Sequence, residues 1–183
     1  TQIVGVKGRR VWDSRGWPTV EVDVTLECGA MGRAIAPAGA SRGRAEAVDL
    51  RDGEEAFGGL DVTQAISGID GEISGALVGL DGMEQVDVDD TLISLDGTPD
   101  KARLGGNATV AVSMAVAHAS AAAQGVPLWQ YLGGTNAGPM PLPEIQIFGG
   151  GAHAEGSVDV QDFLVFATGA EDFATALDWT AEV

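Results

Sequence analysis

Disulfide bonds within the chain are excluded, because the 183 residues include a single cysteine, Cys28. A lone cysteine is typical of proteins in reducing compartments. We interpret Cys28 as a small apolar residue that fills space at the end of a strand. The sequence does not open with a basic segment followed by an apolar run, as a secretory leader would, so we expect a cytoplasmic protein.

Basic residues are scarce and unevenly placed. Ten lysines and arginines face 27 acidic residues, which gives a formal net charge of −17. So acidic a chain is not expected to bind nucleic acid or anionic membranes, whereas it suits metal cations or high salt. All ten basic residues lie at or before Arg103. Chemistry that needs an ammonium or guanidinium group from residues 104–183 is therefore excluded.

A long apolar run is also missing. The most apolar window, residues 108–123, is rich in alanine and is interrupted by Thr109, Ser113, His118 and Ser120. Because a membrane-spanning helix needs about 20 apolar residues, we expect no transmembrane segment. The chain can still bury a sizeable core, since 45% of its residues are hydrophobic.

The N-terminal part of the chain is typical of an antiparallel meander. Residues 3–11, 19–27 and 31–36 are strand-like and are separated by short turns. The second of these segments alternates aliphatic and acidic or hydroxyl residues, which predicts one buried face and one face in water. Glu21 belongs to the polar set.

Helical patterns follow the strands. We expect a short helix from Ala45, a second helix capped by Asp61, a third opened by Asp81, and a fourth capped by Asn107 and ended by Gly125. Strands first and helices afterwards predict an α+β fold, with the helices packed on one face of a small sheet.

A domain boundary is expected near residue 135. Three prolines within residues 139–143 favour extended backbone, so we assign residues 1–135 to one domain and 136–183 to a second. In the second domain, residues 145–148 and 163–167 are predicted strands around a glycine-rich segment, and residues 171–182 are a predicted helix.

A loop of small residues carries the strongest functional signal: PAGASRGRAE at positions 37–46. Gly39 and Gly43 permit close approach of the backbone to a ligand. Ser41 offers a hydroxyl and a carbonyl that suit a hard cation or an anionic ligand. Taken alone, this stretch is also explained by an ordinary solvent loop.

Four further blocks accompany the loop in a fixed order: DSRGWPTVEV at 13–22, LDGTP at 95–99, YLGG at 131–134 and GGGAHA at 149–154. The complete set resembles the enolase family, hydro-lyases of glycolysis that convert 2-phosphoglycerate to phosphoenolpyruvate and water. The resemblance implies a small N-terminal α+β domain followed by an α/β barrel. Since a barrel takes about 250 residues, residues 136–183 are expected to hold only its first strands, and these 183 residues alone to be inactive.

The resemblance also assigns residues to the site. Enolases use Mg²⁺ to spread the charge of a doubly negative intermediate, a lysine to take a proton, and a glutamate to assist departure of the hydroxyl. Ser41 is implied as the Mg²⁺ ligand. His153 and Asp162 are implied as catalytic residues that contact the substrate, and Gly39 and Ala40 as further substrate contacts. Taken alone, His153 is better explained as a structural histidine, and its glycine-rich setting makes the two explanations about equal.

The implied partners are a phosphorylated 2-hydroxy acid and a second copy of the chain. Glu21 matches a residue at the family's subunit interface, although an exposed strand charge is the simpler explanation. Arg15 and Glu46 also match motif positions, but a guanidinium beside Asp13 or a carboxylate at the start of a helix is usually structural.

Several positions depart from the family pattern. Trp17 stands where asparagine is usual, Ala38 replaces serine, Arg42 replaces threonine, Phe148 replaces asparagine, and Asp162 replaces glutamate. Asp162 is one methylene shorter, which can displace a catalytic carboxylate by about an ångström and cost roughly a hundredfold in rate. Two alternatives therefore stay open: dehydration of a different 2-hydroxy acid, and a non-catalytic dimerisation or binding module.

Overall fold

The computed structural model describes residues 1–36, 38–39, 42–134, 138–154 and 156–183. The chain forms two compact units. The larger unit is built from residues 1–39 and 43–135, and residues 136–183 belong to the smaller one.

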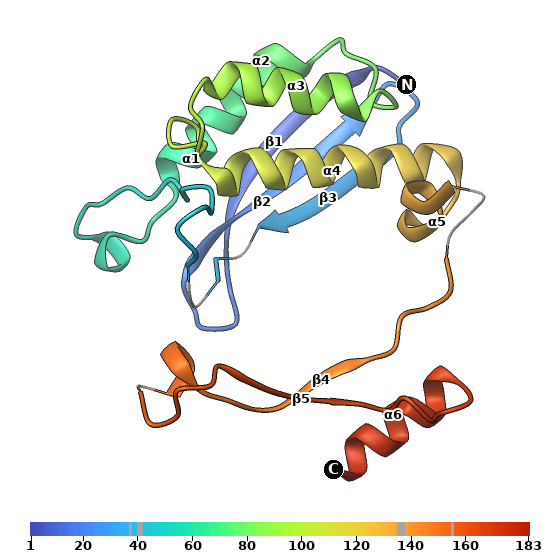
Figure 1. Ribbon diagram of the computed structural model, residues 1–183. Helices are drawn as coiled ribbons and strands as arrows, with labels where there is room; N and C mark the ends of the chain where they lie inside the picture. Colours follow the sequence, from blue (N-terminus) through green and yellow to red (C-terminus); the bar gives the residue numbers. More distant parts are fainter. Residues whose placement is uncertain (37, 40–41, 135–137, 155) are drawn as a thin grey trace. The chain divides into compact units, whose positions relative to one another are not determined.

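A three-stranded antiparallel sheet is the base of the larger unit (Figure 1). Its strands are β1 (Ile3–Trp12), β2 (Pro18–Leu26) and β3 (Met31–Ala36), in that order across the sheet. The predicted meander is therefore confirmed. The aliphatic side chains of β2 are buried as the alternation predicts, and Val20, Val22 and Val24 are all fully inaccessible.

On the opposite face of β2, the acidic side chains Glu21 and Asp23 are not open to water as the alternation had suggested. Glu21 is only 9% exposed, because Arg9 from β1 pairs with it and Arg33 from β3 lies 3.6 Å away. The same two arginines pair with Asp23. The predicted exposed strand charge is thus a member of a network of ion pairs that spans all three strands.

Asp23 makes the stability of this network depend on pH. The hydrogen bond from Arg33, together with that from Arg9, lowers the pKa of Asp23 from 3.8 to about 2. A carboxyl whose pKa is depressed on folding stabilises the fold above its unfolded pKa and loses that contribution as pH falls towards the folded value. We expect at most about 2 kcal/mol to be lost between those two values, since Arg33 is largely exposed.

Urea unfolding at a series of pH values tests this expectation. The Asp23→Asn variant should be less stable than the wild type at neutral pH, and the difference should shrink below pH 4. An unchanged difference across that range would show that Asp23 does not titrate as its contacts indicate.

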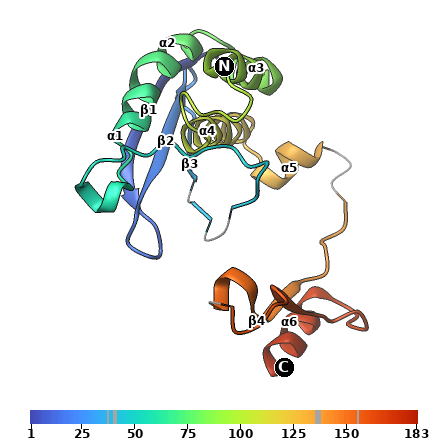
Figure 2. The same cartoon turned by 60° about the vertical axis from the view of Figure 1, so that its left-hand side comes forward.

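Helices cover the other face of the sheet (Figures 1 and 2). A continuous helical segment runs through α1 (Thr63–Gly68), a π-helical turn (Ile69–Ile73) and α2 (Ser74–Leu77) and packs beside β1. It is followed by α3 (Gln85–Asp96), by α4 (Gly106–Gln124) across β2 and β3, and by the short α5 (Leu128–Gly133), which was not predicted. Apart from α5, these helices contribute apolar side chains to one buried cluster with the sheet, so the predicted α+β fold is confirmed.

Close packing of α4 on β3 depends on small residues from both elements. A Cβ atom on Gly32 of β3 would lie 2.1 Å from the Ala115 carbonyl oxygen and 2.2 Å from the Ala119 nitrogen. Ala115 and Ala119 are fully buried. The alanine-rich sequence of α4 therefore serves contact with the sheet, and within the described ranges no helix is both long and apolar enough to cross a bilayer.

The short helix predicted from Ala45 is absent, because residues 47–50 bond to the α3–α4 connection and to the first turn of α4 instead of to each other. The Val48 N–H donates to the Asp100 carbonyl at 2.8 Å. The Leu50 N–H donates to Asn107 Oδ1 at 3.0 Å, and the Asn107 amide returns a bond to the Leu50 carbonyl at 3.1 Å. Asn107 was expected to cap α4 but lies inside that helix, whose N-cap is Gly105.

The cap of α1 was also predicted wrongly. The N–H groups of Thr63 and Gln64 both donate to Asp52 at 3.0 Å, whereas Asp61 forms an ion pair with Arg10 at 2.7 Å. The Asp61 carboxylate still accepts the N–H of Val62, the residue before α1, at 2.8 Å, but it caps neither of the first two helical residues.

The structure confirms the prediction for Gly125 at the end of α4 and contradicts the prediction for Cys28 after β2. Gly125 ends α4 in the left-handed region with φ of 68°, as predicted. Cys28 is exposed in the turn between β2 and β3, so the prediction that it fills space at a strand end was wrong.

Asp96, at the end of α3, organises the connection that leads to α4. Its carboxylate accepts hydrogen bonds from the Thr98 hydroxyl, from the Thr98 N–H at 2.9 Å and from the Leu104 N–H at 2.8 Å. Asp96 is 2% exposed. Burial by itself would raise the pKa of Asp96, but the hydrogen bonds from Thr98 and Leu104 outweigh it and hold the pKa below its usual value.

We expect Asp96→Asn to lower the free energy of unfolding by about 2 to 3 kcal/mol, because an amide cannot accept all three bonds and buried donors lose their partners. Urea denaturation followed by circular dichroism measures the loss. Asp100→Asn, at an exposed carboxylate in the same connection, is the matched control. Equal stability of the two variants would contradict the assigned role of Asp96.

The smaller unit consists of a β-hairpin and a helix. Strands β4 (Glu144–Gly149) and β5 (Asp162–Phe166) pair antiparallel, and α6 (Phe173–Glu182) follows. Among its described residues, the glycine-rich segment that joins the strands holds one 3-10 turn, Gly151–Ala154, and no α-helix of the kind that usually connects parallel strands. Both predicted strands and the predicted helix are present.

Candidate active site

The β1–β2 turn lies beside the start of the motif loop. The Asp13 N–H donates to the Trp17 carbonyl at 2.8 Å, and the Gly16 N–H donates to the Asp13 carbonyl at 3.0 Å. One oxygen of the Asp13 carboxylate accepts the N–H groups of Arg15 and Trp17, at 2.8 and 2.9 Å. The bond from Trp17, with those from Arg15, holds the pKa of Asp13 below its usual value.

Arg15 connects this turn to the loop. Its guanidinium donates to the second oxygen of Asp13 at 3.1 and 3.2 Å and to the Ala38 carbonyl at 2.6 Å. The carbon of the guanidinium also lies 4.8 Å from the centre of the Trp17 ring. Sequence reasoning took Arg15 as a structural partner of Asp13 and missed the contact with Ala38, because the two residues are far apart in the chain.

The far end of the loop is closed by Glu46. Its carboxylate accepts the Gly43 N–H at 2.8 Å, and its own N–H donates to the Gly43 carbonyl at 3.3 Å. Glu46 therefore closes a turn and does not begin a helix. The implied substrate contact Gly39 is exposed, whereas Ala40 and the implied metal ligand Ser41 lie outside the described residues.

Two implied catalytic residues belong to the β4–β5 hairpin. Asp162 is exposed at the first position of β5, opposite Gly149 in the register, and accepts a hydrogen bond from the Gln146 side chain. His153 is in the 3-10 turn Gly151–Ala154, and its side chain lies outside the described part of the structure. Gln146 was not predicted, since its meeting with Asp162 follows from a strand register that the sequence does not show.

Glycines shape the hairpin around these residues. The Gly150 N–H donates to the Gln161 carbonyl at 2.6 Å, and the Gly151 N–H donates to the Val158 carbonyl at 2.7 Å. A Cβ atom on Gly150 would lie 2.0 Å from the Val160 carbonyl oxygen. Close contact between the two arms therefore requires glycine at this position.

Metal ligands do not gather in the described part of the chain. Among these residues no group of three or more histidine, cysteine or acidic side chains is close enough to hold a metal ion. Mg²⁺ prefers octahedral oxygen coordination, usually with one or two carboxylates. The described residues alone therefore do not fit a Mg²⁺ site, and the implied contribution of this chain is limited to the oxygens of Ser41.

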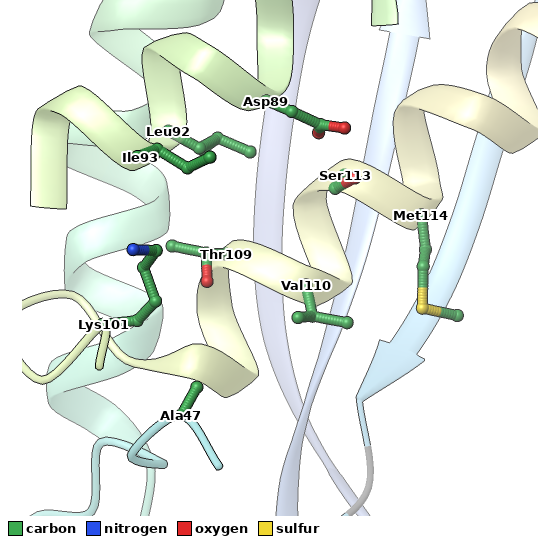
Figure 3. Close-up of a pocket in the computed structure, with 9 residues that line it drawn as sticks. All are labelled: Ala47, Asp89, Leu92, Ile93, Lys101, Thr109, Val110, Ser113 and Met114. Carbon is green, nitrogen blue, oxygen red and sulfur yellow. The ribbon is translucent and has the colours of Figure 1, made fainter. Parts of the chain in front are cut away.

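A groove between α3 and α4 is a separate feature of the larger unit (Figure 3). Its volume is about 270 Å³ and most of its lining is apolar. The lining consists of Ala47, Asp89, Leu92, Ile93, Lys101, Thr109, Val110, Ser113 and Met114. None of the implied site residues that the structure describes lines this groove, so we do not assign it to the reaction.

A small α+β unit followed by two strands and a helix is consistent with a class of two-domain proteins in which such a unit precedes an α/β barrel. Comparison with known protein families agrees with this class. Residues 3–132 match the family model for the enolase N-terminal domain, and residues 138–183 match the model for the enolase C-terminal TIM barrel domain. The chain belongs to the enolase family, as its motifs indicated.

Proposed function

We propose that this chain supplies the N-terminal domain and the first barrel strands of an enzyme that dehydrates 2-phosphoglycerate to phosphoenolpyruvate. The observation that carries the proposal is the match to both enolase domains in the family's order. The hairpin with Asp162 and the loop with Ser41 are the segments through which the chain would take part in the reaction.

The reaction removes a proton from the carbon next to a carboxylate and releases the neighbouring hydroxyl as water. Mg²⁺ would stabilise the negative charge that develops on the substrate carboxylate. Asp162 is the group of this chain suited to the leaving hydroxyl, because a carboxyl can deliver the proton that converts hydroxide into water. The bond from Gln146 orients that carboxyl. Gly39, Ala40 and His153 would contact the substrate.

The enzyme is further proposed to form a homodimer through the polar face of the sheet. Glu21 and Asp23 are already held in place there by Arg9 and Arg33, so a partner would meet a fixed arrangement of charges. Sedimentation of wild type and Glu21→Arg tests this arrangement. A reversed charge should shift the protein towards monomer, and an unchanged mass would exclude this face.

Product formation tests the proposed reaction. The protein in which this domain is joined to a complete barrel should form phosphoenolpyruvate from 2-phosphoglycerate when Mg²⁺ is present. Activity should disappear on treatment with a chelator and return when Mg²⁺ is added. A correctly folded protein that forms no phosphoenolpyruvate under these conditions would overturn the proposal.

A second candidate function is dehydration of a different 2-hydroxy acid. Phe148 stands where the family has asparagine, and its ring stacks on Phe163 with centroids 4.2 Å apart. Phe148 is 52% exposed. An apolar surface next to the glycine-rich turn favours a substrate with less polar character there, and a panel of 2-hydroxy acids of differing polarity, assayed beside 2-phosphoglycerate, distinguishes the two functions.

A further inference from the structure

The guanidinium of Arg15 is not needed to close the turn in which it lies. Two backbone hydrogen bonds join Asp13 to Trp17 and Gly16, and one oxygen of the Asp13 carboxylate accepts two further N–H groups. All four bonds would persist with a shorter side chain at position 15. The side chain of Arg15 is therefore available for a role outside the turn.

That role is indicated by the contacts that orient the guanidinium. The second oxygen of Asp13 holds it from one side through two hydrogen bonds, and the ring of Trp17 lies against its face. The Asp13 side chain is only 7% exposed, which limits its movement. In this arrangement one Nη of Arg15 meets the Ala38 carbonyl at 2.6 Å.

Ala38 is where the chain leaves the sheet for the motif loop. Two residues earlier, the Ala36 carbonyl at the end of β3 accepts a hydrogen bond from the Thr19 hydroxyl at 2.8 Å. Thr19 therefore fixes the end of β3. Arg15, which lies in the β1–β2 turn, fixes the Ala38 carbonyl, the next one along the chain that the structure describes. The Arg15 contact thereby determines the position from which the chain continues towards Ser41.

We propose that Arg15 is a positioning residue of the enolase site, oriented by Asp13 and Trp17 and acting on the backbone at Ala38. The inference rests on the proposed function, in which the loop after Ala38 contributes to the site. Trp17 replaces the asparagine usual in the family, and its ring gives the guanidinium a face to lie against that an asparagine would not supply. Arginine is required because a lysine ammonium cannot fork between a carboxylate and a carbonyl in this geometry.

Amide hydrogen exchange of the 183-residue chain tests the contact without any need for activity. Arg15→Lys and Trp17→Asn should raise exchange in the described residues 42–48 by about tenfold while exchange in β2 stays unchanged. Arg10→Lys is the matched control. Arg10 also pairs with a carboxylate and lies over Trp12 and Phe57, but it contacts none of the described residues of the loop.

Kinetics of the protein with a complete barrel provide the second readout. Arg15→Lys should lower kcat/KM for 2-phosphoglycerate by roughly tenfold or more, without a change in melting temperature, whereas Arg10→Lys should not. Unchanged exchange in residues 42–48, or an equal rise in the loop and in β2, would overturn the assignment of Arg15. If the wild type forms no phosphoenolpyruvate, the proposed function fails, and hydrogen exchange still decides whether Arg15 positions the loop.

Discussion

Among glycine-to-alanine replacements in the three-stranded sheet, Gly32→Ala is expected to cause the largest loss of stability. The new Cβ would lie 2.1 and 2.2 Å from backbone atoms of α4. Backbone atoms cannot rotate away as the end of a side chain can, so α4 must move off β3. We expect a loss of about 3 kcal/mol or more in the free energy of unfolding, which is a large part of the stability of a typical domain.

Urea denaturation of the whole chain, followed by circular dichroism, measures this loss. Gly75→Ala in α2 is the matched control, because a Cβ there meets nothing within 4 Å and alanine favours a helix interior. The control should be as stable as the wild type or slightly more stable. If Gly32→Ala unfolded within about 1 kcal/mol of the wild type, the described packing of α4 on β3 would be wrong.

Replacing Asp162 with asparagine is expected to cause the largest loss of activity. An amide keeps the shape of the carboxyl and a bond to Gln146, but it cannot deliver or accept the proton of the leaving hydroxyl. A general acid–base group typically contributes a factor of about 10² to 10⁴, so kcat of the protein with a complete barrel should fall by that amount.

Steady-state formation of phosphoenolpyruvate measures the effect. Asp159→Asn, at another exposed carboxylate of the same hairpin, is the control and should retain activity. Asp162→Glu should be as active as the wild type or more active, because it restores the family's usual residue. Full activity of Asp162→Asn would show that Asp162 takes no part in the reaction and that other residues carry it out.

The sheet and the core were predictable because they follow local patterns. The alternation along β2 places Val20, Val22 and Val24 in the core, and a helical stripe places Ile69 and Ile73 beside them. The helix expected at Ala45 failed because partners distant in the sequence decide the conformation of residues 47–50. Such partners leave no periodic signal in the local sequence.

The candidate site was predictable as motifs but not as geometry. The glycine-rich turn and Asp162 could be located from the sequence, whereas the bond from Gln146 depends on the β4–β5 register. In the same way, Asp13 and Arg15 were recognised as neighbours, but the contact with Ala38 appears only when β3 lies beside the β1–β2 turn. Residue types indicate the chemistry, and the strand pairing determines which side chains meet.

The substrate preference of the protein with a complete barrel tests the central claim most directly. We predict that kcat/KM with Mg²⁺ is higher for 2-phosphoglycerate than for every acid sugar in a panel of 2-hydroxy acids, and that phosphoenolpyruvate is the product. Dehydration of an acid sugar with no turnover of 2-phosphoglycerate would contradict the account and assign these motifs to a different enolase-like reaction.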